Sequence, residues 1–260
     1  MQQKVYKLTN YLLWRLRMQQ KVYKLTNKDR KTYGGFLYEP NKVYTFPGRG
    51  RLCTSAYSHA YKTPELAVLF NPIHGGFKDP YLLFECEGVV EKDDGTKLGL
   101  TQITVPLLPI MAPKYSALQR IAWGIGSAYK CHSDIYEQDA MWIKWANNWL
   151  MGSDRSAGAA DAATLAYATN AATLAYATSA AYAAGAASAA AHAAGAAADV
   201  IGAAAYAAGY AATYAAAYAA AAAGTPDVAI VALWAKKHSD VWDINTLGNS
   251  RGWDNAKSME

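Results

Sequence analysis

Short segments rich in apolar, β-branched and aromatic residues alternate with polar turns in the first part of the chain, a pattern typical of β-strands. Residues 21–25 alternate between polar and apolar side chains. Residues 81–90 form the strongest strand pattern, and residues 97–105 follow them after an Asp-Gly turn, so these two segments are predicted to pair antiparallel. Residues 33–38 and 42–46 flank a Pro-Asn turn and are predicted to form a hairpin.

Helical patterns follow. The sequence Thr63-Pro64-Glu65 predicts a helix start, because threonine caps the first free amides and proline suits the first turn. Three prolines between residues 106 and 113 end the strand-rich region. Residues 116–128 place apolar side chains at helical spacing, and residues 135–150 predict a further helix with a cap at Ser133. In that helix a tryptophan stripe indicates a packing face; its members are Trp142, Trp145 and Trp149.

The later part of the chain has a different composition. Residues 156–224 carry only two charged side chains and are dominated by alanine, so intrinsic propensity favours helix. A nine-residue segment at 162–170 is repeated with one change at 171–179. Tyrosines spaced by four lie on one helix face and are predicted to form an interaction surface; they are Tyr206, Tyr210, Tyr214 and Tyr218. Residues 228–237 predict a last helix.

These patterns together predict an α+β fold, with a small antiparallel-sheet N-terminal domain followed by an Ala-rich all-α helical region. Residues 1–10 are identical to residues 18–27, so we interpret residues 1–17 as a duplicated or leader segment. The predicted domains are then residues 18–150 for the α+β domain, 151–238 for the Ala-rich helical region and 239–260 for a tail lying on the surface.

Charge is distributed unevenly along the chain. Residues 1–62 hold thirteen Lys and Arg against two acidic residues, whereas the remainder is net acidic, although the whole chain is at +5. Such a basic segment is either a solvated arm or a contact for nucleic acid or an anionic surface.

The sequence predicts neither a metal nor a cofactor. The three cysteines are widely spaced and form no CxxC pair, and no Gly-rich phosphate-binding motif is present. Residues 201–224 are uncharged and have about the length of a membrane span, but they lack Leu, Phe and Val. We therefore expect a protein of the cytoplasm rather than of the membrane.

One catalytic hypothesis involves two carboxylates. Glu85 and Glu87 are two residues apart in a predicted strand, so both project from the same face. An arginine, a Thr-Ser pair and a Glu-x-Glu occur in this order in some ADP-ribosyltransferases; here they would be Arg49 or Arg51, Thr54-Ser55, Glu85 and Glu87. The alternative is an edge strand whose polar face is solvated.

Part of the first domain resembles an uncharacterised family of phage-encoded accessory proteins. The resemblance rests on residues 35–39 leading to 42–44, on the Cys-containing segment and short helix of residues 53–70, and on Phe84-Glu85-Cys86-Glu87-Gly88. The chain departs from the family at residues 56–60, where a Gly-Phe-His-like run is usual. The resemblance implies a bacteriophage origin, fits an Ala-rich C-terminal extension and assigns no catalytic residue.

We therefore expect a non-enzymatic phage accessory or structural protein that acts through protein–protein contacts, either with a protein partner or by self-association into an oligomer. The Ala-rich helices would form the assembly or partner surface. The resemblance places such a protein in the cytoplasm of an infected bacterial host or in the virion. Two alternatives remain open: an ADP-ribosyltransferase-like enzyme using Arg51, Ser55, Glu85 and Glu87, and a membrane-associated protein.

Overall fold

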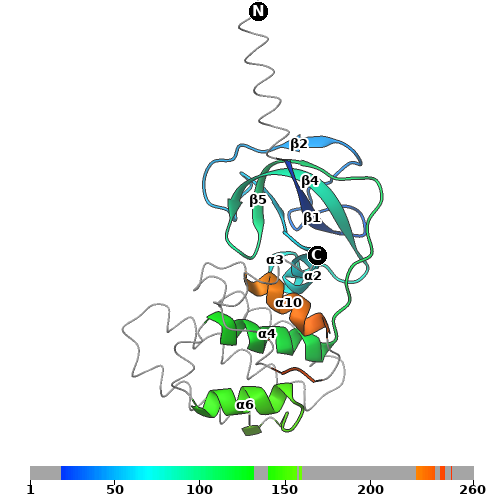
Figure 1. Ribbon diagram of the computed structural model, residues 1–260. Helices are drawn as coiled ribbons and strands as arrows, with labels where there is room; N and C mark the ends of the chain where they lie inside the picture. The colour runs from blue at the N-terminus through cyan, green and yellow to red at the C-terminus, as the bar shows by residue number, and fades with distance from the viewer. Residues whose placement is uncertain are drawn as a thin grey trace, which may run out of the picture. The chain divides into compact units, whose positions relative to one another are not determined.

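The computed structural model describes residues 19–131, 140–156, 158–159, 227–237, 241–243 and 247. The chain divides into two compact units, Met1–Pro113 and Lys114–Glu260 (Figure 1). The division falls at the end of the proline-rich segment, earlier than the boundary predicted at residue 150. The helices after residue 116 make their packing contacts within the second unit, which explains the difference.

Several predictions concern segments outside the described residues. These are the duplicated segment at residues 1–17, the cap at Ser133, the nine-residue repeat and the tyrosine surface at Tyr206, Tyr210, Tyr214 and Tyr218.

The first unit contains a five-stranded antiparallel sheet whose order is β1-β4-β5-β2, with β3 also paired to β5. The strands are β1 (Gln19–Asn27), β2 (Val43–Thr45), β3 (Ser58–Ala60), β4 (Tyr81–Asp93) and β5 (Leu98–Thr104). The antiparallel pairing predicted for residues 81–90 and 97–105 is confirmed, and so is the α+β class of this unit. The short strand β3 had no predicted counterpart.

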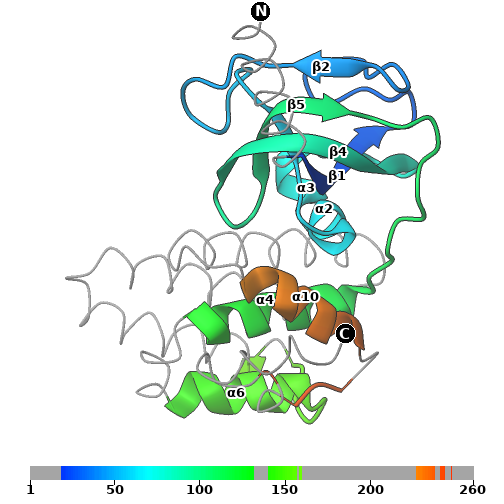
Figure 2. The same ribbon diagram turned by 45° about the horizontal axis from the view of Figure 1, so that its top comes forward.

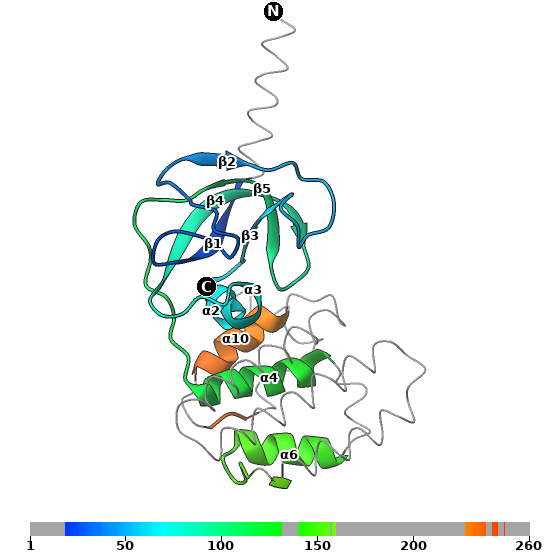
Figure 3. The ribbon, with the colours of Figure 1, turned by 180° about the vertical axis from the view of Figure 1, so that it is seen from behind.

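The sheet curls back on itself. β2 and β3 share the edge of β5 that faces away from β4. Directly after β3, Tyr61 pairs with Tyr23 of β1 through two backbone hydrogen bonds of 2.8 and 2.9 Å. This bridge closes a ring from β1 through β4, β5 and β3 back to β1, visible from behind in Figure 3. Of the five described strands, β2 lies outside the ring.

The predicted hairpin between residues 33–38 and 42–46 is wrong, because β2 pairs with β5. Tyr38 instead exchanges hydrogen bonds with Arg30: its amide donates to the Arg30 carbonyl at 3.1 Å, and its own carbonyl accepts from Arg30 Nε at 2.8 Å. Asn41, at a φ of 58°, then donates its amide to Val105. After this turn, β2 therefore lies beside β5 and not beside residues 33–38.

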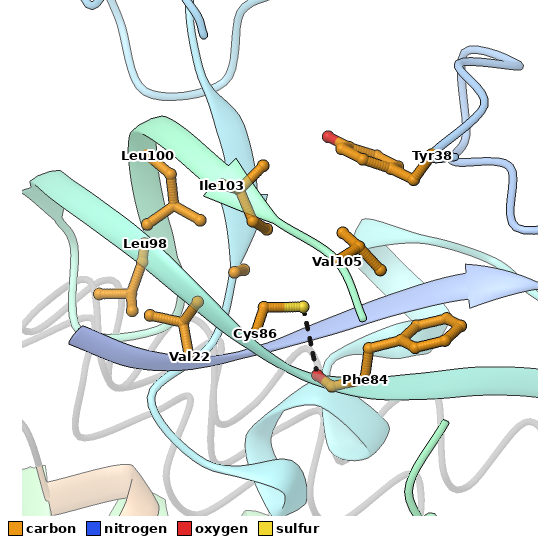
Figure 4. Packing of buried hydrophobic residues seen from close by; sticks show 9 residues of the cluster. Val22, Tyr38, Phe84, Cys86, Leu98, Leu100, Ile103 and Val105 are labelled. Atoms are coloured by element: carbon orange, nitrogen blue, oxygen red, sulfur yellow. Dashed lines mark hydrogen bonds between the residues drawn. The ribbon is translucent and has the colours of Figure 1, made fainter. Parts of the chain in front are cut away.

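A hydrophobic cluster of the first unit, which we call its core, lies on one face of this sheet (Figure 4). Its buried members are Val22, Tyr38, Ala60, Phe84, Cys86, Leu98, Leu100, Ile103 and Val105. Burying each large apolar side chain contributes roughly 1.5–3 kcal/mol. The Cys86 Sγ lies 3.7 Å from the Phe84 carbonyl, to which it donates a weak hydrogen bond.

Two short helices, α2 (Pro64–Leu69) and α3 (Asn71–His74), accompany the sheet, and α2 contacts β1 and β4 (Figure 2). The predicted start of α2 is confirmed, since the Thr63 hydroxyl accepts a hydrogen bond from the Leu66 amide at 3.2 Å. The buried residues of α2 hold it against the sheet.

The second unit contains helices α4 (Ala117–Cys131), α6 (Ala140–Leu150) and α10 (Asp227–Lys237) among its described residues. A capping box starts α4: the Gln119 amide donates to Ser116 Oγ at 3.1 Å, and the Ser116 amide donates to Gln119 Oε1 at 2.9 Å. Gly126 lets α10 approach α4 closely, because a Cβ atom there would lie 2.9 Å from Val231 and 3.0 Å from Trp234.

The tryptophan stripe of α6 is buried, as predicted from its spacing; Trp142, Trp145 and Trp149 are at most 5% exposed. Trp149 stacks on Trp242 with 6.4 Å between ring centroids, and the guanidinium of Arg155 lies over both rings. Trp242 is fully buried. The prediction that the tail lies on the surface is therefore wrong at this residue, whose large apolar ring packs inside the unit.

Candidate functional site

A cavity of about 650 Å³ opens in the first unit on the side of the sheet that carries the core. Its walls are largely aromatic, with Tyr33, Phe36, Tyr38, Phe46, Tyr57, Tyr61 and Phe77 contributing side chains. Hydroxyl groups of threonine and serine and four basic or imidazole side chains complete the lining. A cavity of this size with an apolar wall and a few polar groups has the general make-up of a small-molecule site.

Lys24 of β1 is one of two lysines that line this cavity. It is in phase with Val22 along the strand, so its side chain lies on the core side, where it is only 5% exposed. Its ammonium donates to the His59 carbonyl at 2.5 Å and more weakly to Ser58 Oγ at 3.5 Å. Burial lowers the pKa of Lys24 to about 8.

Tyr38 and Ser58 stand beside this lysine. Their hydroxyl oxygens are 2.7 Å apart, and the Lys24 ammonium lies 5.1 Å from the centre of the Tyr38 ring. Burial raises the pKa of Tyr38 to about 12, so the phenol stays protonated at neutral pH. The three residues form one hydrogen-bonded group, contributed by β1, by the loop before β2 and by β3.

Two histidines lie on another part of the wall. His74 is stacked against Tyr61 and Phe70, and its Nδ1 is 3.2 Å from the Tyr61 hydroxyl. Burial lowers the pKa of His74 to about 4. His59 is hydrogen-bonded to the Leu52 carbonyl, and burial lowers its pKa as well. Both rings are therefore neutral near pH 7.

The structure does not assemble the residues of the ADP-ribosyltransferase hypothesis into one site. Ser55 lines the cavity, whereas Arg51 is exposed and is not part of its wall. Glu85 and Glu87 lie on the face of β4 opposite Cys86, where they border a separate, smaller cavity of about 240 Å³ with the start of β1. The Glu85 carboxylate pairs with Lys21 at 2.9 Å.

The interpretation of residues 81–90 as an edge strand is also wrong, because β4 lies between β1 and β5. The polar face of β4 is nevertheless accessible, since Glu87 is exposed and Glu85 half-buried. A strand in the interior of a sheet can have one solvated face when no second layer covers it.

A separate feature is a set of exposed apolar side chains around β2, which we call the edge surface. Its members are Tyr33, Phe36, Leu37, Val43, Leu107 and Leu108. Arg30 connects two segments of this surface, residues 36–38 and residues 106–108. Its guanidinium donates to the carbonyls of Pro106 and Leu107 at 2.9 and 3.1 Å, and its Nε donates to the Tyr38 carbonyl. β2 itself ends the path of the sheet and has no strand on its outer side in the described part of the chain.

Within the described residues, no group of three or more His, Cys, Asp or Glu side chains is arranged to hold a metal ion. In the same residues, no helix is long and apolar enough to cross a membrane.

Sequence reasoning missed the group around Lys24. The alternation of residues 21–25 could have indicated that Lys24 is buried. Lys24 is on the same face of the strand as Val22, where an apolar residue is expected. Its neighbours Tyr38, Ser58 and His59 come from segments far away in the sequence, and no local spacing connects them.

No family model matches the chain, and comparison with curated proteins and with solved structures likewise gives no match.

Proposed function

We propose that this protein is a non-enzymatic accessory or structural protein that acts through protein–protein contacts. The observation that carries the proposal is the edge surface: Tyr33 is 86% exposed, Leu108 74% and Val43 52%. Clustered apolar side chains of this kind mark protein contact sites. The outer side of β2, which pairs with no strand among the described residues, adds backbone donors and acceptors that another chain can use.

The Ala-rich segment is a second contact surface in this proposal, and its support comes from the sequence. Residues 156–224 combine high helix propensity with almost no charge and few bulky apolar side chains. Helices of this composition gain little from burying their own faces, so we propose that they form an all-α region that associates with other helices, in the same chain or in a partner. Tyr206 and Tyr210 would then lie in the contact, together with Tyr214 and Tyr218.

The resemblance to phage-encoded accessory proteins supplies the biological setting. We place the protein in an infected bacterial cell or in the virion, where assembly proceeds through such contacts.

Light scattering of the purified full chain tests the proposal, with Val43→Lys and Leu108→Lys as variants. The wild type is expected to have a mass above that of one chain, and the two lysines are expected to reduce association through the edge surface, because a charge there must be desolvated on contact. Gln20→Lys is the matched control: it adds the same charge at an exposed position of β1 and should leave the mass unchanged.

The Ala-rich surface has a separate readout. Hydrogen exchange of the same samples is expected to show protected amides in residues 156–224. A chain that stays monomeric at high concentration, exchanges rapidly throughout residues 156–224 and captures no partner from infected cells would contradict the proposed function.

A further inference from the structure

We propose that the cavity of the first unit binds a small organic anion that carries a planar ring, with the anionic group seated on the Lys24 ammonium. Ligand binding in this cavity does not require that the edge surface contacts a protein. Two residues, Tyr33 and Phe36, belong both to the cavity wall and to the edge surface.

The positive charge of the cavity wall has no opposing carboxylate. Lys24 and Lys97 line the cavity, and no Asp or Glu is among the described residues of its wall. None of the ion pairs in the described part of the chain involves Lys24. A buried charge without a counter-ion costs several kcal/mol, and an anion in the cavity would offset that cost.

Asp94 does not take this role. Asp94 acts electrostatically on both histidines but is exposed, and its Oδ1 already accepts hydrogen bonds from the Thr96 amide, the Thr96 hydroxyl and the Lys97 amide. It belongs to the turn between β4 and β5 and does not line the cavity.

Lys24 also keeps one N–H donor without an acceptor in the described part of the chain. A lysine ammonium has three N–H groups, and Lys24 directs two of them to Ser58 Oγ and to the His59 carbonyl. The third has no acceptor within the described residues. The hydroxyls of Tyr38 and Ser58 are hydrogen-bonded to each other, and Tyr38 lies beside the Lys24 ammonium. An anionic oxygen placed there would contact the free N–H of Lys24 and lie next to these hydroxyl groups.

The cavity wall suits a ligand with a planar ring. Aromatic side chains surround the cavity, and their faces suit stacking against a planar ring. The hydroxyls of Thr54 and Ser55 add donors and acceptors at the same cavity. At about 650 Å³ the space has room for a molecule of nucleotide size. Size, aromatic walls and unbalanced positive charge thus select the same class of ligand.

Isothermal titration calorimetry of the full chain at pH 7 tests the inference. The probe is adenosine 5′-monophosphate, which combines a planar ring, hydroxyls and a dianion. Adenosine and inorganic phosphate are titrated separately, so that the ring and the anion are each examined alone. The nucleotide is expected to bind at least ten-fold more tightly than either part.

Lys24→Met is the test variant, because it keeps an unbranched apolar stem, one atom shorter, while removing the charge. It is expected to weaken nucleotide binding at least ten-fold. Lys21→Met is the matched control: it is the same substitution on the same strand, but Lys21 lies on the other face, paired with Glu85. Its affinity should equal that of the wild type.

A measurement on the wild type protects the test against a variant that fails to fold. Amide chemical shifts of residues 24, 38, 58 and 59 are expected to change during titration with the nucleotide. Absence of nucleotide binding at millimolar concentration, shift changes confined to residues outside the cavity, or unchanged affinity in a folded Lys24→Met protein would each overturn the inference.

Discussion

Lys24 and Val22 project from the same side of β1, although one side chain is charged and the other apolar. Strand periodicity alone places both toward the core, and the sequence could have indicated the buried lysine on that basis. The sequence could not show its partners, because Ser58 and Tyr38 reach it through tertiary structure. For a single residue, the face of the strand from which its side chain projects was therefore predictable, but the groups that contact the side chain were not.

His74 makes stability depend on pH at the residue scale. Burial lowers its pKa from 6.5 to about 4, so the unfolded chain takes up the proton more readily than the folded one. The contribution of the neutral ring is complete above pH 6.5 and is lost as the pH falls toward 4. We expect acidification from pH 7 to pH 4.5 to lower the free energy of unfolding by roughly 2 kcal/mol through this residue, measured by urea denaturation.

His74→Phe isolates that contribution, since it retains an aromatic ring against Tyr61 and Phe70 but cannot be protonated. Its stability should fall by less than that of the wild type over the same pH interval, while His59 continues to titrate in both proteins. Parallel curves for the two proteins would show that His74 is not the group responsible.

At the scale of elements, helix starts were more predictable than strand partners. The hydroxyls of Thr63 and Ser116 accept hydrogen bonds from backbone amides three residues later. Such caps depend only on neighbouring residues, so they can be recognised from the local sequence. The partner of β2 is not local. A turn at Asn41 and the contacts of Arg30 decide that residues 43–45 join β5, and the local Pro-Asn pattern suggested a hairpin with residues 33–38 instead.

Thr63→Ala should lower the free energy of unfolding by about 1 kcal/mol, the usual cost of removing an N-cap. The Thr63 hydroxyl accepts from the Leu66 amide in the first turn of α2, and alanine leaves that donor without this acceptor. Chemical denaturation of the variant measures the loss. Thr63→Ser keeps the hydroxyl and should retain most of the stability; equal losses in both variants would mean that the cap is not the cause.

Gly99 is a packing constraint on the pairing of β3 with β5. It lies opposite His59, and a Cβ atom there would collide with Leu52 and lie 3.2 Å from the Tyr57 ring. We expect Gly99→Ala to lower the free energy of unfolding by roughly 1–3 kcal/mol, as overpacking does.

Gly34→Ala is the comparison for that variant, because no atom lies within 4 Å of a Cβ at that position. Its melting temperature should stay close to that of the wild type. A Gly99→Ala protein as stable as Gly34→Ala would show that Leu52 and Tyr57 can move aside at little cost.

At the scale of the whole molecule, composition predicted a strand-rich first part and a helical later part, and the first of these is confirmed. The predicted boundary at residue 150 differs from the division at Pro113, because the periodicity of residues 116–150 identifies helices but does not say which core they join. Trp242 shows the same limit, since an aromatic residue among polar neighbours gave no sign of its contact with Trp149.

Deleting residues 1–17 should change the melting temperature little. β1 begins at Gln19 and pairs with β4 from Gln19 to Asn27, so the strand position is filled by the second copy of the duplicated sequence. The deletion removes four positive charges and should weaken non-specific binding to nucleic acid at low salt. A large drop in the melting temperature would mean that the first copy contributes to the fold.

The closure of the sheet by Tyr23 and Tyr61 has a consequence for the order of events on the ribosome. β1 is the first of the described strands to be made, yet its full partner β4 begins only at Tyr81, and the ring needs β5 as well. At about 5–20 residues per second, β1 waits several seconds with its apolar face uncovered. The nascent chain carries this exposed strand until residue 104 has left the exit tunnel, which makes that interval the time when a chaperone or a second nascent chain can capture it.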